Sequence, residues 1–279
     1  MSLRLAWVSD PHLDILRSPE QLETFLSEVE STGADRVLIS GDISNASRLE
    51  DDLILMARRW NRPIDFVLGN HDFYGGGIGS MRQRMRELSS SEPLLNWLPA
   101  SSPCLLSPGV ALTGHDGWAD GRLGDFLRSE LLLNDYLLIQ EFQPILELYN
   151  YEFHIMNPPE RLALLNKLGD EAAEWSRQAL GLALEARELV IFLTHVPPFE
   201  QSALHGGRPS GMLDLPHFTS KAMGDVLLEV AAAHPQRTVQ VLCGHTHAPA
   251  TFQPLPNLLV HTSGAVYGKP TVTRVLEID

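Results

Sequence analysis

Short apolar runs rich in β-branched and aromatic residues alternate along the chain with stretches of helical periodicity. The apolar runs have the length of strands, and Gly, Pro, Asp or Asn stands at the ends of most of them. They predict strands at 3–8, 35–40, 64–69, 109–114, 188–194, 238–244, 257–263 and 272–278. The stretches between them predict helices at 19–31, 48–60, 78–89, 170–187 and 219–233. Early alternation followed by a strand-rich end predicts an α/β fold.

Residues 119–169 interrupt this alternation. The segment LRSELLLNDYLLIQEFQPILELYNYEF within them is apolar, aromatic and rich in helix formers, and it is too long for a simple connection. No repeat, low-complexity tract or Gly/Ser linker divides the chain, so we interpret 119–169 as a helical insert or cap within a single domain that spans 1–279. Its apolar face has to pack on the core or on a second copy of the chain, which leaves a homo-oligomer open.

Five of the predicted strands stop on side chains that can bind a metal ion. In chain order these endings are Asp10-Pro11-His12, Gly41-Asp42, Gly69-Asn70-His71-Asp72, His195 and Gly244-His245-Thr246-His247. Each motif alone is typical of a turn, because Asp, Asn, Gly and Pro favour turns. Five separate turns do not each need His, Asp or Asn, however, and ligand sites in α/β sheets form at the carboxyl ends of strands. The joint pattern therefore indicates a metal site.

Composition and charge restrict the environment and the partners. The 279 residues include 35 Asp and Glu against 21 Lys and Arg, a formal net charge of -14, which disfavours a broad contact with a phosphate backbone. We therefore expect no extended nucleic acid as partner. Two cysteines, Cys104 and Cys243, are too few for a disulfide framework, and no apolar stretch approaches the roughly 20 residues of a membrane span. These features predict a cytoplasmic protein without a membrane partner.

The five motifs, taken in order, resemble the calcineurin-like metallophosphoesterase superfamily. The pattern of that superfamily is Asp-x-His, Gly-Asp-x-x-Asp, Gly-Asn-His-Asp/Glu, a lone His and Gly-His-x-His, and the resemblance here runs from residue 10 to 247. It implies a four-layer αββα sandwich in which two mixed sheets are flanked by helices, with two metal ions at one edge. One position departs from the pattern, because Asn45 replaces the second acid of the Gly-Asp motif. We expect Asn45 to act beside the ligands or as a helix cap.

The resemblance also implies a set of metal ligands drawn from all five motifs. They are Asp10, His12 and His247 for the first metal, Asn70, His195 and His245 for the second, and Asp42 as a bridge between the two. Alternation along an extended segment separates His245 from His247, so that they can serve different metals. Iron, manganese, zinc, cobalt and nickel all suit His, Asp and Asn ligands, so the identity of the two divalent ions stays open.

The implied reaction is hydrolysis of a phosphate mono- or diester by a hydroxide that bridges the two metals. His71 follows the ligand Asn70, so its ring is expected to reach the bound phosphate and to protonate the leaving oxygen as a general acid. Asp72 is expected to orient His71. The alternative role for His71 is a fixed donor to phosphate that moves no proton.

A small or nucleotide-type phosphate ester is the favoured substrate. The branch that acts on phosphoserine and phosphothreonine in proteins carries an Arg before its Gly-Asn-His motif and Asp-Arg-Gly after its bridging acid. This chain has Leu68 and ISNAS in those places, which disfavours that branch. The sequences HVPP and GHTH are similar to bacterial phosphodiesterase and phosphohydrolase branches. The competing interpretation is a non-catalytic scaffold that binds a partner protein through the hydrophobic insert, but a scaffold would tolerate loss of ligands, and none is lost here.

Two further groups of residues are candidates for the pocket wall. His115, Asp116 and Trp118 follow the strand predicted at 109–114, at the edge where the site is expected, and either line the pocket or form a turn. His205 and Arg208 lie in a loop after His195 and are a weaker candidate for contact with substrate.

Overall fold

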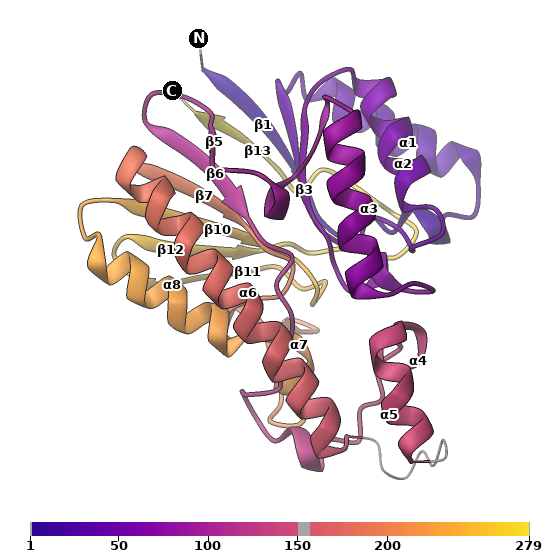
Figure 1. The fold of residues 1–279 in the computed structure, drawn as a ribbon. Helices are drawn as coiled ribbons and strands as arrows, with labels where there is room; N and C mark the ends of the chain where they lie inside the picture. Colours follow the sequence, from indigo (N-terminus) through magenta and orange to yellow (C-terminus); the bar gives the residue numbers. More distant parts are fainter. Residues whose placement is uncertain (1, 150–156, 279) are drawn as a thin grey trace.

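Two β-sheets lie face to face at the centre of the computed structural model, which describes residues 2–149 and 157–278 (Figure 1). The first sheet contains, in spatial order, β13 (Arg274–Ile278), β1 (Leu3–Val8), β2 (Arg36–Ser40), β3 (Ile64–Val67) and β4 (Leu95–Trp97). The second contains β11 (Ala250–Leu255), β12 (Leu258–Thr262), β10 (Thr238–Cys243), β7 (Leu189–Leu193), β6 (Val110–Gly114) and β5 (Cys104–Leu105). Inner strands pair in parallel, whereas β13, β11 and β5 join antiparallel at the edges.

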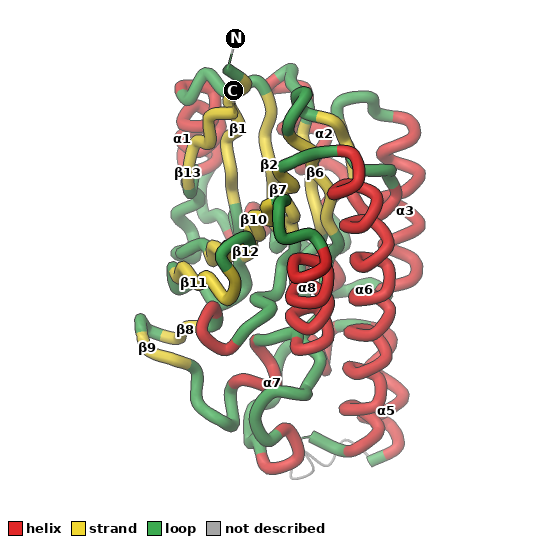
Figure 2. Tube along the Cα trace, turned by 90° about the vertical axis from the view of Figure 1, so that its left-hand side faces the viewer, coloured by secondary structure: helices red, strands yellow, loops and turns green. Residues whose placement is uncertain are grey.

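Helices cover the outer face of each sheet and complete four layers (Figures 1 and 2). The first sheet is covered by α1 (Pro19–Ser31), α2 (Leu49–Trp60) and α3 (Ile78–Ser91), and the second by α6 (Pro159–Ala186) and α8 (Lys221–Ala233). Apolar side chains fill the space between the sheets, among them Trp7, Leu38, Leu112, Ile191 and Leu242. The predicted α/β sandwich of two mixed sheets flanked by helices is therefore confirmed.

Local sequence explains where several elements begin and end. Helix α1 begins after Ser18, whose amide donates to the side chain of Gln21 in a capping box, and Pro19 fits the first turn because its missing N–H needs no partner there. Helix α6 begins at Pro159 for the same reason and continues through the predicted helix at 170–187. Strand β11 was not predicted, because Gln253 and Pro254 interrupt the pattern of this edge strand.

The region predicted as an insert lies beyond the carboxyl ends of the strands, where α4 (Asp135–Leu138) and α5 (Gln143–Leu148) are found below α3 in Figure 1. Residues 150–156 of that region lie outside the described residues. The backbone of Gly75 donates to Leu138, and that of Gln140 donates to Gly76. The carboxylate of Glu141 accepts from the amides of Ile78 and Gly79 at the start of α3. These contacts attach α4 and the turn before α5 to the loop that follows β3 and to the start of α3.

Part of the apolar surface of the same region is covered by the chain's own core. Tyr136, Ile139 and Phe142 are fully buried in the hydrophobic cluster that also contains Phe73 and Trp118. The helix α7 (Leu215–Phe218) and a short hairpin of β8 (Leu204–His205) and β9 (Arg208–Pro209) lie at the same end of the molecule. Among the described residues, no helix is long and apolar enough to cross a bilayer.

Candidate metal centre

In the loops that follow the strands, several residues adopt a left-handed backbone conformation that residues other than Gly rarely adopt. The backbone φ angle is positive at five of the predicted ligands, namely Asp10, His12, Asp42, His245 and His247. Among the described residues, the only other non-glycine residue with positive φ is Asn61, at the end of α2. Left-handed backbone costs roughly 1–2 kcal/mol per residue, and such strain concentrates at functional sites. The strain here falls where the side chains converge.

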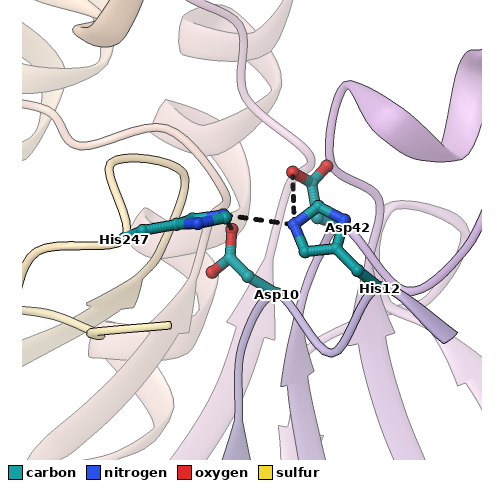
Figure 3. A group of neighbouring side chains, drawn as sticks. All are labelled: Asp10, His12, Asp42 and His247. Carbon is teal, nitrogen blue, oxygen red and sulfur yellow. Dashed lines mark hydrogen bonds and ion pairs between the residues drawn. The ribbon is translucent and has the colours of Figure 1, made fainter. Parts of the chain in front are cut away.

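Four of these side chains meet in a first cluster, shown in Figure 3, that contains Asp10, His12, Asp42 and His247. One ligand atom from each lies within 4.8 Å of the others. The Nε2 atoms of His12 and His247 are 3.1 Å apart, and His247 Nε2 is 3.4 Å from Asp10 Oδ1. Asp42 Oδ2 is 3.7 Å from His12 Nε2. Two imidazole nitrogens and two carboxylates that face one point form a donor set suited to a divalent transition metal.

A second cluster contains Asp42, His195 and His245, again with ligand atoms within 4.8 Å of one another. Asp42 Oδ1 is 3.3 Å from His195 Nε2, and Asn70 Oδ1 lies 3.1 Å from the same nitrogen. Asp42 thus directs one carboxylate oxygen to each cluster. The structure brings all seven predicted ligands to one end of the two sheets.

Hydrogen bonds outside the clusters fix which ring nitrogen is free. His195 Nδ1 is 2.9 Å from the carbonyl oxygen of Ser40, which only accepts, so Nδ1 carries a proton and Nε2 is the nitrogen left to bind a metal once a proton on it is displaced. His245 Nε2 is 3.1 Å from the carbonyl oxygen of His217, which leaves His245 Nδ1 free. Both free nitrogens therefore suit metal ligation.

The electrostatics of the centre require a positive charge. Burial raises the pKa of the Asp42 carboxyl, but attraction to His195 and other imidazoles outweighs this and holds the pKa well below its usual value. Burial disfavours the His195 imidazolium, yet attraction to Asp42 and Asp10 raises the pKa of His195 to about 10. In the metal-free protein a proton on His195 balances the buried carboxylates, and a bound cation fulfils the same need.

Three glycines leave room for the ligand side chains. A Cβ atom at Gly69 would overlap Asp42 Oδ1, and one at Gly244 would overlap Asp10 Oδ2. A Cβ atom at Gly41, where φ is +94°, would lie 2.6 Å from His195 Nδ1. The donor set, the charge and this close backbone approach together fit a metal centre.

A family model described as calcineurin-like phosphoesterase matches residues 3–249. The chain belongs to this family. Solved structures that share its fold include the following three. A dimetal phosphatase from Danio rerio is 15% identical with a TM-score of 0.56, covering 94% of this chain and 87% of that chain. The phosphopantetheinyl hydrolase of Mycobacterium tuberculosis is 16% identical with a TM-score of 0.56, covering 96% and 91%.

The third structure is GAP50, described as the anchor in the inner membrane complex of Plasmodium. It is 13% identical with a TM-score of 0.50 and covers 94% of this chain and 71% of that chain. At these identities the likenesses establish the fold alone. No curated protein sequence matches the chain.

In this calcineurin-like phosphoesterase, His71 lies at the rim of the first cluster and is partly exposed. Its ring centroid is 4.5 Å from that of His12 and 4.3 Å from that of Tyr74. Its backbone amide donates to Asp42 Oδ1 over 2.9 Å. The ring of His71 thus lies beside the first cluster.

Asp72 has different contacts from those expected. Its buried carboxylate accepts hydrogen bonds from the amides of Ile43, Ser44 and Gly69, each over 2.8 Å. Among the described residues, no hydrogen bond joins it to the ring of His71. Asp72 therefore ties the loop of Asp42 to the loop of Asn70.

Asn45 also lies outside the two clusters of this phosphoesterase. Its Oδ1 accepts from the amide of Ser47 over 3.1 Å, and its carbonyl accepts from the amide of Leu49 at the start of α2. Its Nδ2 donates to Asp14 over 3.3 Å. An amide oxygen serves this turn as well as a carboxylate would, so the loss of the second acid leaves the seven ligands in place.

Of the residues predicted as candidates for the pocket wall, some are buried and support nearby loops, and others are exposed. Asp116 is buried and accepts from the amide of Leu68 over 2.8 Å and from Trp97 Nε1 over 3.0 Å, which supports the loop before Asn70. His115 is buried against Trp175, and its Nδ1 accepts from the amide of Gly117. Trp118 and Asp116 line a small cavity beside Asn70, His195 and His245. His205 and Arg208 are exposed in the β8–β9 hairpin.

Three residues beside the centre were not predicted, namely the aromatic residues Tyr74 and Tyr267 and the acid Asp135. Tyr267 is 55% exposed, and its ring lies 4.7 Å from the rings of both His12 and His247. Asp135, from α4, accepts from Asn70 Nδ2 over 2.8 Å and from the hydroxyl of Tyr74 over 2.6 Å. Tyr74 comes two residues after the Gly69–Asp72 motif. Asp135 and Tyr267 stand in no recognisable motif, and only their contacts in the fold connect them with the predicted ligands.

Proposed function

We propose that this phosphoesterase hydrolyses a small phosphate mono- or diester with two divalent metal ions as cofactors. The observation that carries the proposal is the position of Asp42, whose two carboxylate oxygens face two separate donor clusters. A site for a single ion has no need of a shared carboxylate between two sets of histidines. Family membership supports the phosphoesterase activity.

Each cluster would hold one ion. The ligands would be Asp10, His12 and His247 for the first, Asn70, His195 and His245 for the second, and Asp42 for both. Two such ions supply an activated water at neutral pH and neutralise charge on the phosphoryl oxygens. Iron, manganese, zinc, cobalt and nickel are all suited to these donors.

Three residues that are not among the proposed metal ligands would also contribute to the reaction. His71 would donate a proton to the oxygen of the leaving group, since its ring lies at the open side of the first cluster, 4.5 Å from the ring of His12. Asp72 would hold the loops of Asp42 and Asn70 at a fixed distance through its three bonds to backbone amides. Tyr267 would contact the organic part of the ester, because its ring is exposed beside the same cluster.

The fold by itself does not decide between hydrolysis and a scaffold role, because one structural relative is described as an anchor. The side chains favour hydrolysis. The side chains of both clusters converge, with Asn70 beside His195 and His71 beside His12, and Tyr136, Ile139 and Phe142 of the insert are buried in the molecule's own core.

The test is removal and return of metal. Chelated protein should lose hydrolysis of p-nitrophenyl phosphate and of bis(p-nitrophenyl) phosphate and regain at least one of them with one of the five metals. Asp42→Asn should not regain it, whereas Asp51→Asn, an exposed acid on α2, should behave as wild type. Wild-type protein that is inactive on both esters with every metal, or active despite chelation, would contradict the proposal.

A further inference from the structure

The two proposed metal sites differ in their contacts with the insert. Asp135 accepts a hydrogen bond from Asn70 Nδ2, and Asn70 belongs to the second site. Asp135 is 5% exposed and comes from α4, far along the chain from the loop that carries Asn70. Among the described residues, no hydrogen bond or ion pair joins 119–149 to Asp10, His12 or His247 of the first site.

The contact with Asp135 determines how the amide of Asn70 is turned. A carboxylate only accepts hydrogen bonds, so the edge of the amide that faces Asp135 must be its NH2 group. The carbonyl oxygen of Asn70 then faces His195 Nε2, 3.1 Å away, which is the orientation a metal ligand requires. Tyr74 strengthens the arrangement, because its hydroxyl donates to the same oxygen of Asp135 and accepts from Asn70 Nδ2 over 3.2 Å.

Tyr136, the next residue of α4, is connected through His217 with His245, a second proposed ligand of the same site. The hydroxyl of Tyr136 is 2.7 Å from His217 Nδ1, and His217 Nε2 is 2.9 Å from the hydroxyl of Ser129. The backbone carbonyl of His217 is the group that accepts from His245 Nε2. Consecutive residues of α4 therefore support Asn70 directly and His245 through His217.

We infer that Asp135 is a positioning residue for the second metal site, and that docking of the insert and binding of the second metal are coupled. The inference rests on the proposed function. Groups that orient metal ligands typically change metal affinity by about 10–100-fold when they are removed. Coupling is also reciprocal, so a metal at the second site should stabilise α4 in its docked position.

The first test titrates metal-free protein with Mn²⁺ alone and follows binding by calorimetry. Wild type should bind two ions. Asp135→Ala should keep one site at wild-type affinity and weaken the other by about 10–100-fold, so its titration should approach that of His195→Ala rather than that of His12→Ala. Asp135→Asn keeps an accepting oxygen for Asn70 and Tyr74 and should recover much of the loss. Asp125 is an acid of the insert whose carboxylate, among the described residues, accepts only from Arg128. Asp125→Ala is therefore the matched control and should bind as wild type.

A second test needs no change at Asp135 and therefore does not depend on the fold of that variant. Amide hydrogen exchange of residues 135–139 should slow when Mn²⁺ is added to wild type, and should not slow in His195→Ala, where the first site alone remains. The coupling would be overturned if Asp135→Ala bound Mn²⁺ with unchanged affinity at both sites, or if it weakened both sites equally. It would also be overturned if Mn²⁺ did not slow the amide exchange of residues 135–139 in wild type. Wild type that binds fewer than two ions would overturn the proposed two-metal site and this inference with it.

Discussion

Asp42 is the residue that the two clusters of candidate ligands share. Its φ of 52° turns the backbone so that Oδ2 faces His12 and Oδ1 faces His195, and the amide of His71 donates to Oδ1 as well. The sequence predicts this residue because it stands directly after a strand and a glycine. It does not predict the left-handed backbone, which only the tertiary contacts of the loop enforce.

The proposed role of His71 as proton donor can be tested with a single substitution. His71→Ala should leave both metals bound, since the ligands remain, and should slow hydrolysis of an alkyl phosphate ester by about 10²–10⁴-fold. A p-nitrophenolate departs without a proton, so the loss on a p-nitrophenyl ester should be much smaller. Rates on the two esters, with the metal content of each sample measured, give the comparison.

Equal losses on both esters at unchanged metal content would assign His71 the alternative role of a fixed donor to phosphate. Arg59→Ala, an exposed change on α2 remote from the centre, serves as the control and should leave both rates unchanged.

Single residues also mark where prediction from sequence stops. The convergence of the predicted ligands could be foreseen because each follows a strand within a short motif. Asp135 could not, because it lies in a segment without a motif and meets Asn70 only after α4 docks beside the loop that follows β3. The contacts of Asp72 could not be predicted from the sequence either, because its partners are backbone amides and every residue except Pro has one.

The ends of the strands are the elements that build the centre. The parallel strands β1, β2 and β3 of one sheet and β7 and β10 of the other lead into the loops that carry the ligands. The alternation of apolar runs and helices was sufficient to predict these strands, because buried parallel strands are continuously apolar. The beginning of α6 was not predicted, because its first turns share the helix-forming composition of the insert.

The glycine after β10 gives a prediction for these strand ends. Gly244→Ala would place a Cβ against Asp10 Oδ2 and Ser9 Oγ, so it should weaken Mn²⁺ binding at the first site and destabilise the metal-free protein by about 1–3 kcal/mol. Gly181→Ala is the contrasting variant, because it lies within α6 with nothing within 4 Å of the new Cβ. It should stabilise the protein by about 0.5–1 kcal/mol.

Denaturant unfolding and Mn²⁺ titration of both variants measure these effects. A Gly244→Ala protein with wild-type stability and wild-type affinity for both ions would show that the backbone moves away without cost and that the close approach is not required.

The whole molecule explains why residues so far apart in the sequence form one site. The two sheets lie face to face around the core that contains Trp7, Leu38 and Leu242, so the carboxyl ends of strands from both sheets meet at one end. The insert lies over that end (Figure 1). The layer arrangement was implied by the resemblance to the calcineurin-like superfamily, whereas the position of α4 beside the second cluster emerges only from three-dimensional packing.

The measurement that tests the two-metal site most directly is anomalous diffraction at the manganese edge from crystals grown with Mn²⁺. We predict two peaks about 3.5–4 Å apart. One should be bound by Asp10, His12 and His247, the other by Asn70, His195 and His245, with Asp42 between them. A single peak, or peaks bound by other residues, would contradict the account.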